Sequence, residues 1–376
     1  MIRFDAVTKT FPDGTTAVGG LSLEAPSGQI TVLVGPSGCG KTTSLRMINR
    51  MIDRSTGTIW LDDRDTATIT PTLLRRGMGY VIQSAGLFPH RTVLDNVAAV
   101  PLLLGGSKRE ARKNAVGLLE RVGLDSAIGR RYPAQLSGGQ QQRVGVARAL
   151  AADPPVMLMD EPFSAVDPVV REQLQNEFLR LQAELGKTIV FVTHDIDEAI
   201  KLGDQVAVLR VGGTLAQLAP PAELLARPAD PFVAGFVGRD RGYRALGFAT
   251  AGALPVSDEA VVRVGAPLAE AIDAATDGWV LVVDDANAPQ GWFATDPERG
   301  AATVTADLLN LGGTLAGENA TWRETLDAAL SAPSGRGVLV DGDGALAGTV
   351  TATAVVAELE KLTDRRVAPT SSAAAP

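Results

Sequence analysis

The sequence predicts an α/β domain, with a parallel sheet buried between helices, followed by a smaller α+β domain. Short apolar runs rich in valine, isoleucine and leucine recur along the first part of the chain and lie between helical stretches. This alternation is typical of a parallel sheet that helices cover. The runs that we expect as strands are residues 29–35, 155–160, 187–195 and 205–210.

Length and composition are those of a globular protein. The 376 residues suffice for two or three domains, 45% are hydrophobic and 21% are charged. The net charge of −8 gives no reason to expect nucleic acid as a partner. The single cysteine, Cys39, excludes an intrachain disulfide and fits a reducing compartment. Because the start lacks a secretory signal and no apolar run approaches the roughly 18 residues that span a bilayer, we expect a soluble intracellular chain.

The charge is distributed unevenly, which suggests a domain boundary near residue 239. Residues 240–376 hold 9 Lys and Arg against 19 Asp and Glu, a net charge of −10. Residues 1–239 hold 26 against 24, a net charge of +2. The expected parts are a first domain over 1–238, a second over 239–365 and a disordered tail over 366–376.

The first expected strand leads into a glycine-rich loop and then into a helical stretch. GPSGCGKTT matches the pattern G-x-x-x-x-G-K-[ST], in which backbone N–H groups close around the β-phosphate and the following helix adds its positive end. We expect Lys41 to bridge the β- and γ-phosphates of ATP, and the Thr42 hydroxyl to hold Mg²⁺. Cys39 is expected as a small filler without a redox role. The expected ATP-binding residues here are Gly35, Pro36, Ser37, Gly38, Cys39, Gly40, Lys41, Thr42 and Thr43.

Two acids follow the buried run VMLM. Asp160, at the carboxyl end of the expected strand, is placed to bind Mg²⁺ through water. Glu161 is then placed to polarise the attacking water as general base. The alternative for any single Asp-Glu pair is an ordinary acidic turn after a core strand, but the phosphate-binding loop upstream favours the catalytic interpretation.

Three further residues are candidates for the same site. His194 follows an apolar run, at the strand edge where open α/β sheets keep their ligands, so we expect it to contact the γ-phosphate. Gln83 ends another apolar run and is expected to reach Mg²⁺ or the attacking water. Phe11 is expected to stack on adenine, although simple packing is the alternative. His90 is assigned no chemistry.

A second glycine-rich loop, LSGGQ, precedes a strong helical pattern. Ser137 occupies an N-cap position and Gly138 and Gly139 leave the backbone open, which makes another anion-binding helix start. The first loop already supplies a phosphate site. We therefore expect Ser137, Gly138, Gly139 and Gln140 to bind ATP held by a different copy of the chain.

Together these motifs resemble the ATPase subunit of ATP-binding-cassette (ABC) transporters, over residues 1 to about 238. The resemblance implies a P-loop NTPase fold with a helical subdomain at about 84–150, Mg²⁺-dependent ATP hydrolysis and a head-to-tail dimer with two ATPs at its interface. Ser137 to Gly139 of one copy would then contact the γ-phosphate bound by Lys41 of the other. Residues 164–167 would form the loop between the subunits.

Three segments look most like the ATPases of osmoprotectant importers, which take up glycine betaine, choline, carnitine or proline: residues 47–63, 79–97 and 236–246. This resemblance implies integral membrane permease subunits, whose coupling helices would meet residues 84–97, and indirectly an extracytoplasmic solute-binding protein. The chain would then sit at the cytoplasmic face of the cell membrane. Ser55 and Ser84 depart from residues common in that subfamily.

The acidic second domain contains a weak internal repeat. Residues 268–296 align loosely with residues 322–354, each expected as a helix, an apolar strand, a turn and a second strand. The repeat resembles a degenerate pair of CBS modules, whose nucleotide-binding members favour Gly-h-h-Thr/Ser-x-x-Asp, h being apolar. Ala354 replaces the Asp in the second copy, and Ala294 and Pro297 interrupt the pattern in the first. Sensing of ionic strength by the −10 charge and dimerisation without a ligand both remain open.

Osmoprotectant import has three alternatives: import of another solute, a soluble ABC ATPase and a binding module. An importer ATPase for another small solute, such as an amino acid, keeps every motif above. A soluble ABC ATPase acting on ribosomes or DNA usually has two cassettes or long insertions, and this chain shows neither. A binding module with an inactive ATP site is disfavoured because Lys41, Asp160, Glu161 and His194 are all present.

Overall fold

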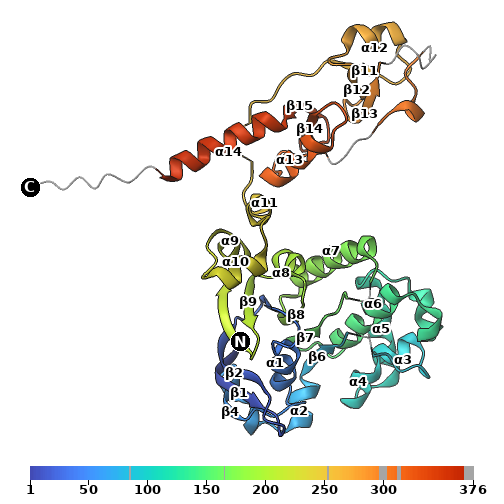
Figure 1. The fold of residues 1–376 in the computed structure, drawn as a ribbon. Helices are drawn as coiled ribbons and strands as arrows, with labels where there is room; N and C mark the ends of the chain where they lie inside the picture. The colour runs from blue at the N-terminus through green and yellow to red at the C-terminus, as the bar shows by residue number, and fades with distance from the viewer. Residues whose placement is uncertain (84–85, 165, 252–253, 296–302, 311–314, 368–376) are drawn as a thin grey trace, which may run out of the picture. The chain divides into compact units, whose positions relative to one another are not determined.

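The computed structural model describes the chain except for residues 84–85, 165, 252–253, 296–302, 311–314 and 368–376 (Figure 1). The side chains of residues 362–367 are also outside the description. The chain divides into two compact units, Met1–Arg239 and Asp240–Pro376. Ser84, Ala165 of the expected intersubunit loop and Pro297 of the repeat all lie outside the described residues.

A six-stranded sheet forms the centre of the first unit. Its strands are β3 (Ile30–Val34), β6 (Met78–Val81), β7 (Val156–Asp160), β8 (Thr188–Val192), β9 (Gln205–Arg210) and β10 (Thr214–Ala219). Their order is β10-β9-β3-β8-β7-β6. All neighbours are parallel except β10, which pairs antiparallel with β9. The four predicted strands are confirmed as β3, β7, β8 and β9, and β3, β7 and β8 are buried throughout.

A four-stranded antiparallel sheet of the first unit was not predicted. It has the order β2-β1-β4-β5, with β1 (Ile2–Thr10), β2 (Thr16–Ala25), β4 (Thr56–Leu61) and β5 (Arg64–Asp65). In β1 the buried side chains are Ile2, Phe4 and Val7. Ala6 has φ 46° and the pairing shifts register between Phe4 and Val7, so the irregularity breaks the two-residue alternation that identifies a strand.

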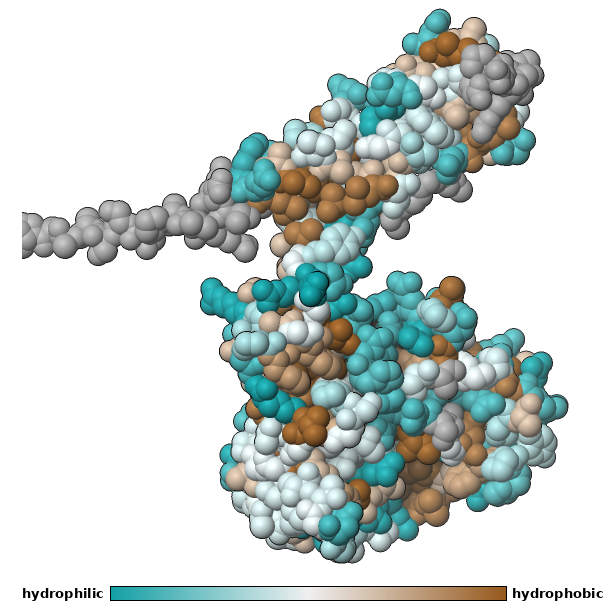
Figure 2. Space-filling view, viewed as in Figure 1, coloured by the Kyte–Doolittle hydropathy of each residue, from teal (hydrophilic) through white to brown (hydrophobic). Residues whose placement is uncertain are grey.

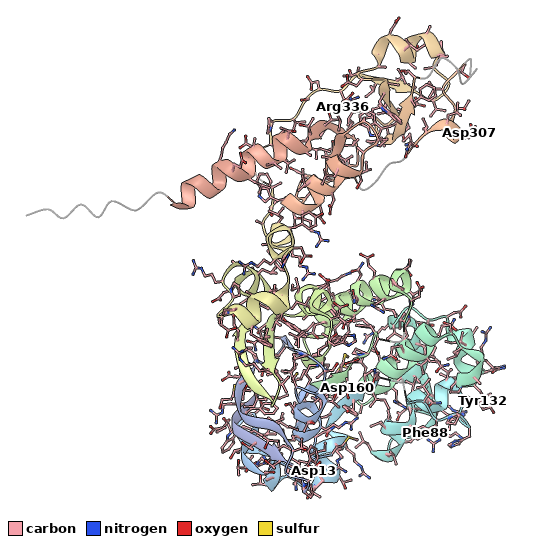
Figure 3. The ribbon with its side chains drawn as sticks, viewed as in Figure 1. Asp13, Phe88, Tyr132, Asp160, Asp307 and Arg336 are labelled. Carbon is pink, nitrogen blue, oxygen red and sulfur yellow. The ribbon has the colours of Figure 1, made fainter. Side chains whose placement is uncertain are left out.

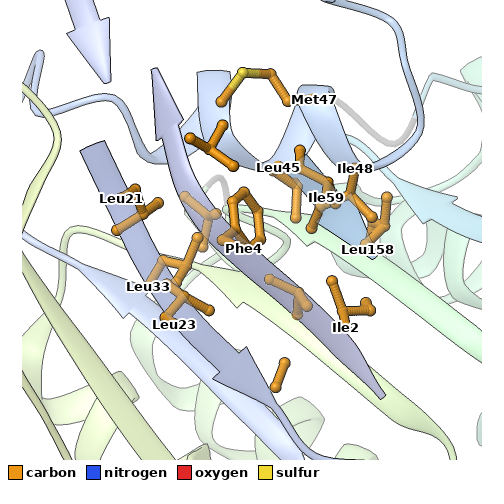
Figure 4. Packing of buried hydrophobic residues seen from close by; sticks show 14 of the residues in the cluster. Ile2, Phe4, Leu21, Leu23, Leu33, Leu45, Met47, Ile48, Ile59 and Leu158 are labelled. Atoms are coloured by element: carbon orange, nitrogen blue, oxygen red, sulfur yellow. The ribbon is translucent and has the colours of Figure 1, made fainter. Parts of the chain in front are cut away.

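The core of the first unit joins elements that are distant in the sequence. Phe4 and Leu21 come from the antiparallel sheet, Leu33 and Leu158 from the parallel sheet, and Leu45 from the first helix (Figure 4). Each is at most 2% exposed, and burying one such side chain contributes about 1.5–3 kcal/mol. This packing fixes the strand ends that carry the candidate site.

Helices cover the parallel sheet and fill the connection between β6 and β7 (Figure 1). They are α1 (Lys41–Ile48), α2 (Pro71–Arg76), α3 (Val93–Val97), α4 (Ala99–Leu103), α5 (Lys108–Arg121), α6 (Gly138–Leu150), α7 (Pro168–Leu185), α8 (Ile196–Leu202), α9 (Pro221–Ala226) and α10 (Pro231–Val237). In α5 the Ser107 hydroxyl caps the N-terminus by accepting the Glu110 N–H, and Ala111, Ala115 and Leu119 form the buried stripe.

The second unit contains the predicted repeat of helix, strand, turn and strand. The first copy is α12 (Leu268–Ala274), β12 (Trp279–Val283) and β13 (Pro289–Ala294), with β11 (Val261–Arg263) parallel to β12. The second is α13 (Trp322–Ser331), β14 (Arg336–Val340) and β15 (Leu346–Thr351). In each copy the two strands after the helix pair antiparallel.

The two copies share a small core, and a partly buried ion pair joins the second copy to the segment that precedes the first. Leu281 and Trp292 of the first copy pack with Val338 of the second. Arg336 donates to Glu259 from Nε at 2.9 Å, and its guanidinium carbon lies 4.8 Å from the centroid of the Trp292 ring. Arg336 is labelled in Figure 3.

A short helix and a long helix flank the repeat. Helix α11 (Arg241–Ala245) precedes it and α14 (Ala352–Val367) follows it. The disordered tail was predicted to begin at residue 366, but residues 366 and 367 belong to α14, and the rest of the predicted tail lies outside the described residues. Of the helices described, none combines the length and apolar character needed to cross a bilayer.

Candidate functional site

The predicted phosphate-binding loop connects β3 to α1, and its first and last glycines fit only as glycine. Gly40 has φ 86°, and a Cβ there would lie 2.2 Å from the carbonyl oxygen of Ala17. A Cβ on Gly35 would lie 2.4 Å from the carbonyl oxygen of Leu209. Because side chains are excluded at both positions, backbone groups line the loop, as phosphate binding requires.

Lys41 lies inside this loop and is only 7% exposed. Its Nζ donates to the carbonyl oxygens of Gly35 at 2.7 Å and Pro36 at 3.0 Å. Cys39 is buried beside it, with Sγ 3.7 Å from Nζ. Burial raises the pKa of the Cys39 thiol, which keeps it protonated and unreactive. This agrees with the role of filler predicted for Cys39.

Thr42 and Asp160 meet where α1 begins and β7 ends. The Thr42 hydroxyl donates to Oδ1 of Asp160 at 2.8 Å. Asp160 is 6% exposed, and burial raises the pKa of its carboxyl despite the Thr42 hydrogen bond and the positive charge of Arg46. A hydroxyl and a carboxylate are the hard oxygen donors that Mg²⁺ prefers. The direction of the pKa shift means that burial disfavours the ionised carboxylate of Asp160 more than the nearby positive charge favours it.

Glu161, Gln83 and His194 follow three neighbouring strands and converge. Oε2 of Glu161 lies 3.1 Å from Nδ1 of His194 and accepts a hydrogen bond from Nε2 of Gln83 at 3.3 Å. The Glu161 N–H donates to the Val192 carbonyl of β8 at 2.9 Å. Glu161 has φ 46°, a left-handed conformation that costs free energy in a residue other than glycine and is common at functional sites.

The second glycine-rich loop is the N-terminus of α6. The Ser137 hydroxyl oxygen accepts from the Gln140 N–H at 3.3 Å, and Gln140 Oε1 accepts from the Ser137 N–H at 3.0 Å. This capping box directs the first N–H groups of the helix outward, where an anion can be bound. Across the residues described, no hydrogen bond joins 137–140 to the loop at 35–43.

Phe11 starts the turn between β1 and β2. Its N–H donates to the Thr15 carbonyl at 2.9 Å, and the Lys9 ammonium lies 5.2 Å from its ring centroid. Phe11 is half-buried. The structure thus joins Thr42 to Asp160, and Glu161 to Gln83 and His194, while Phe11 and Ser137 have no described contact with these groups.

Sequence reasoning missed two charged residues beside the site. Nη2 of Arg46 lies 3.9 Å from Oδ2 of Asp160, and Arg46 follows Thr42 by one helical turn, a spacing that predicts proximity. Glu198 is 7% exposed and lines a cavity of about 50 Å³ together with Glu161 and His194. The sequence feature that indicates burial of Glu198 is its helical spacing beside Ala199 and Leu202, which form the buried face of α8.

Comparison with known proteins agrees with this geometry. Residues 18–164 match the family described as ABC transporter. The osmoprotectant import ATP-binding protein OsmV of Salmonella typhimurium is 45% identical over 82% of this chain and 83% of its own length. The carnitine transport ATP-binding protein OpuCA of Listeria monocytogenes is 42% identical over 95% of this chain and 91% of its own length.

A solved structure extends the likeness to three dimensions. The dimeric, post-hydrolysis ATP-binding cassette MJ0796, bound to ADP and Pi, has a TM-score of 0.54 and 33% identity. It covers 59% of this chain and 99% of its own length. The phosphate-binding loop, the acids after β7 and relatives matched over most of their length lead to one conclusion: this chain belongs to the family of ABC transporter ATP-binding proteins.

Proposed function

We propose that this chain is the ATP-hydrolysing subunit of an importer for osmoprotectants such as glycine betaine, choline, carnitine or proline. The hydrolytic part rests on one observation, the Glu161 carboxylate held between His194 and Gln83, next to Asp160. The solute class rests on relatives named for osmoprotectant and carnitine transport. Several relatives named for glycine betaine or choline, 41–49% identical to this chain, support the same class.

ATP would bind with its β-phosphate inside the loop at residues 35–43. Lys41 exchanges its two carbonyl partners for phosphate oxygens, and the N–H groups at the start of α1 face the same phosphates. Thr42 and Asp160 would hold Mg²⁺, with Gln83 as a further ligand. When bound, the metal neutralises charge on the phosphates as the γ-phosphoryl group leaves. Phe11 is proposed to stack on adenine.

Glu161 would act as general base for hydrolysis. Its carboxylate is partly exposed, 21% for the side chain, and is therefore open to a water molecule. His194, 58% exposed, would contact the γ-phosphate, and Gln83 would help to orient the attacking water. Because Gln83 and His194 already fix the Glu161 carboxylate, the chain places the base before the reaction begins.

A second copy of the chain would complete each ATP site. The capping box leaves the N–H groups of Gly138 and Gly139 free at the start of α6, yet no described contact joins them to the Lys41 loop of the same chain. The similarity to a cassette described as dimeric and bound to ADP and Pi supports a dimer, for which we propose a head-to-tail arrangement. Hydrolysis would then depend on closure of the dimer.

The permease subunits would dock on the helical region between β6 and β7. Phe88 is 41% exposed, Tyr132 47% and Leu103 64%, and apolar atoms gather over α4 (Figure 2). Phe88 and Tyr132 are both labelled in this region in Figure 3. An apolar surface of this kind fits the coupling helices of a membrane partner at its cytoplasmic face. The solute-binding protein would act on the opposite side.

We propose that the second unit is a regulatory module, similar to a degenerate CBS pair. It contains a cleft of about 310 Å³ whose described lining includes Glu318 and Asp341 but no Lys or Arg. Such a lining opposes an anionic nucleotide. Without a nucleotide, two roles are left for this module. It would either sense ionic strength through its net charge of −10 or dimerise the chain.

Glu161→Gln tests the proposed function. The variant keeps the shape of the side chain but not the base, so it should bind Mg-ATP, lose turnover at least a hundredfold and accumulate as an ATP-bound dimer, which size-exclusion chromatography would detect. Adding EDTA should return it to monomers. Steady-state hydrolysis close to that of the unmodified chain would remove Glu161 from the role of base, and a variant that stays monomeric would contradict the shared site.

A further inference from the structure

Behind the Glu161–His194 pair lies a buried carboxylate to which the proposed mechanism gives no role. Glu198 is 7% exposed and belongs to the first turn of α8. Its Oε1 accepts a hydrogen bond from Nε2 of Gln175 on α7 at 3.2 Å, and Gln175 is itself 7% exposed. A buried carboxylate is costly unless its hydrogen bonds are specific, so the position is worth a functional explanation.

On its other side, Glu198 reaches the turn that carries His194. Burial raises the pKa of the Glu198 carboxyl, and the Thr193 side chain, which lines the same cavity, partly lowers it. Because the Thr193 oxygen accepts from the Asp195 N–H at 3.0 Å, its own O–H remains to donate to the carboxylate. The Thr193 N–H also donates to the Leu33 carbonyl of β3 at 3.2 Å. The Glu198 carboxylate is therefore placed to hold the residue that directly precedes His194.

Helix α7 leads from Gln175 back to residues 166–167, the end of the expected intersubunit loop. One turn before Gln175, Arg171 donates from Nη2 to the Val166 carbonyl at 3.0 Å. Asp167 caps α7 by accepting the Val169 N–H at 3.0 Å. The Nε–H of Arg171 is buried and has no hydrogen-bond partner in the described structure. Arg171 borders the cavity that Glu161, His194 and Glu198 also line.

We propose that Glu198 is a positioning residue, which holds the His194 turn against α7 and so links the catalytic pair to residues 166–167. The inference rests on the proposed function, because it concerns hydrolysis by the paired form. Glu198 touches neither phosphate nor the attacking water. Its effect passes through Thr193 on one side and through Gln175 on the other.

The test measures steady-state ATP hydrolysis by the full-length chain, per nucleotide-binding site. Glu198→Ala should lower kcat at least tenfold and change the KM for ATP by less than twofold, because the Lys41 loop is untouched. Glu198→Gln keeps the acceptor for Gln175 and should retain at least a third of kcat. Gln175→Leu removes one hydrogen bond and should lower kcat about threefold.

Glu172→Gln is the matched control. Glu172 is exposed and pairs with Lys201 at 3.7 Å, so this variant breaks a surface contact between the same two helices and should leave kcat unchanged. The double variant Glu198→Ala with Gln175→Leu should lose no more than Glu198→Ala alone, because both changes break one connection.

The outcomes separate this inference from the proposed function. If the unmodified chain does not hydrolyse ATP, the proposed function fails. If it does, the positioning role is overturned by a normal kcat in Glu198→Ala, by losses that add in the double variant, or by equal losses in Glu198→Gln and Glu198→Ala. Should Glu198→Ala fail to fold, Gln175→Leu decides, and a normal kcat in that variant overturns the proposal.

Discussion

Gly40 and Gly14 have the same φ of 86°, yet their surroundings differ. A Cβ on Gly14 would have no atom within 4 Å, whereas a Cβ on Gly40 would lie 2.2 Å from the Ala17 carbonyl oxygen. At the residue scale, the phosphate-binding loop therefore depends on two separate demands. One is a left-handed backbone, which costs a residue with a side chain about 1–2 kcal/mol, and the other is close approach to a neighbouring strand.

Substituting alanine for Gly14 and for Gly40 separates the cost of the left-handed backbone from the cost of the close contact with Ala17. Gly14→Ala should lower the free energy of unfolding by about 1 kcal/mol, the cost of the backbone conformation alone. Gly40→Ala adds a clash with backbone and should cost more than about 3 kcal/mol, together with loss of ATP binding. Urea denaturation and nucleotide binding measure both effects. Equal losses in the two variants would show that the contact with Ala17 is not rigid.

The sequence alone identifies those residues of the candidate site that lie at the carboxyl ends of strands. Asp160, Glu161, Gln83 and His194 each come after an apolar run, and parallel strands bring their carboxyl ends to one edge of the sheet. Glu198 could not be found in that way. In the sequence it is one acid among the polar residues of HDIDE, and only packing against α7 shows that it is buried.

Among the elements, those buried on both faces were the most predictable. Strands β3, β7 and β8 are buried throughout and mostly apolar because helices cover the sheet, so their sequences identify them as strands. Strand β1 has a mixed pattern and a register shift after Phe4, and its partners are set by contacts distant in the sequence. The antiparallel sheet therefore followed only from the structure.

Helix α6 carries the element-scale prediction, because its N-terminus lacks a described partner in its own chain. If each site combines the Lys41 loop of one copy with the Ser137 cap of another, Lys41→Ala and Ser137→Arg should each be inactive alone. A one-to-one mixture should recover roughly a quarter of the activity, since half of the dimers then contain one intact site out of two. ATPase assays of the mixture measure this.

The control mixture pairs Ser137→Arg with a chain that carries both changes. Every site in it contains at least one defect, so no activity should return. Activity in the first mixture that does not exceed that of either variant alone would contradict a site shared between copies.

For the molecule as a whole, the main contrast is electrostatic. The first unit is nearly neutral and the second has a net charge of −10. The Debye length falls from about 30 Å at 0.01 M salt to about 10 Å at 0.1 M and 3 Å at 1 M. Salt therefore weakens the repulsion among the acidic side chains of the second unit. It also weakens the electrostatic field of this unit at any charged neighbour. Both effects change most at moderate salt, which gives the second unit a physical means to respond to ionic strength.

Transport-coupled ATP hydrolysis should therefore depend on salt through residues 240–376. We expect the salt curve of the complex containing the full chain to differ from that of the complex containing residues 1–239, mostly between about 0.01 M and 0.3 M, where the Debye length changes steeply. The shorter chain retains its own core, and the similar cassette covers 59% of this chain, slightly less than this part. Changing Asp258, Asp273 and Asp277 to Asn removes three exposed charges from the full chain and should give an intermediate curve. Superimposable curves, with a change only in oligomeric state, would assign the second unit to dimerisation instead.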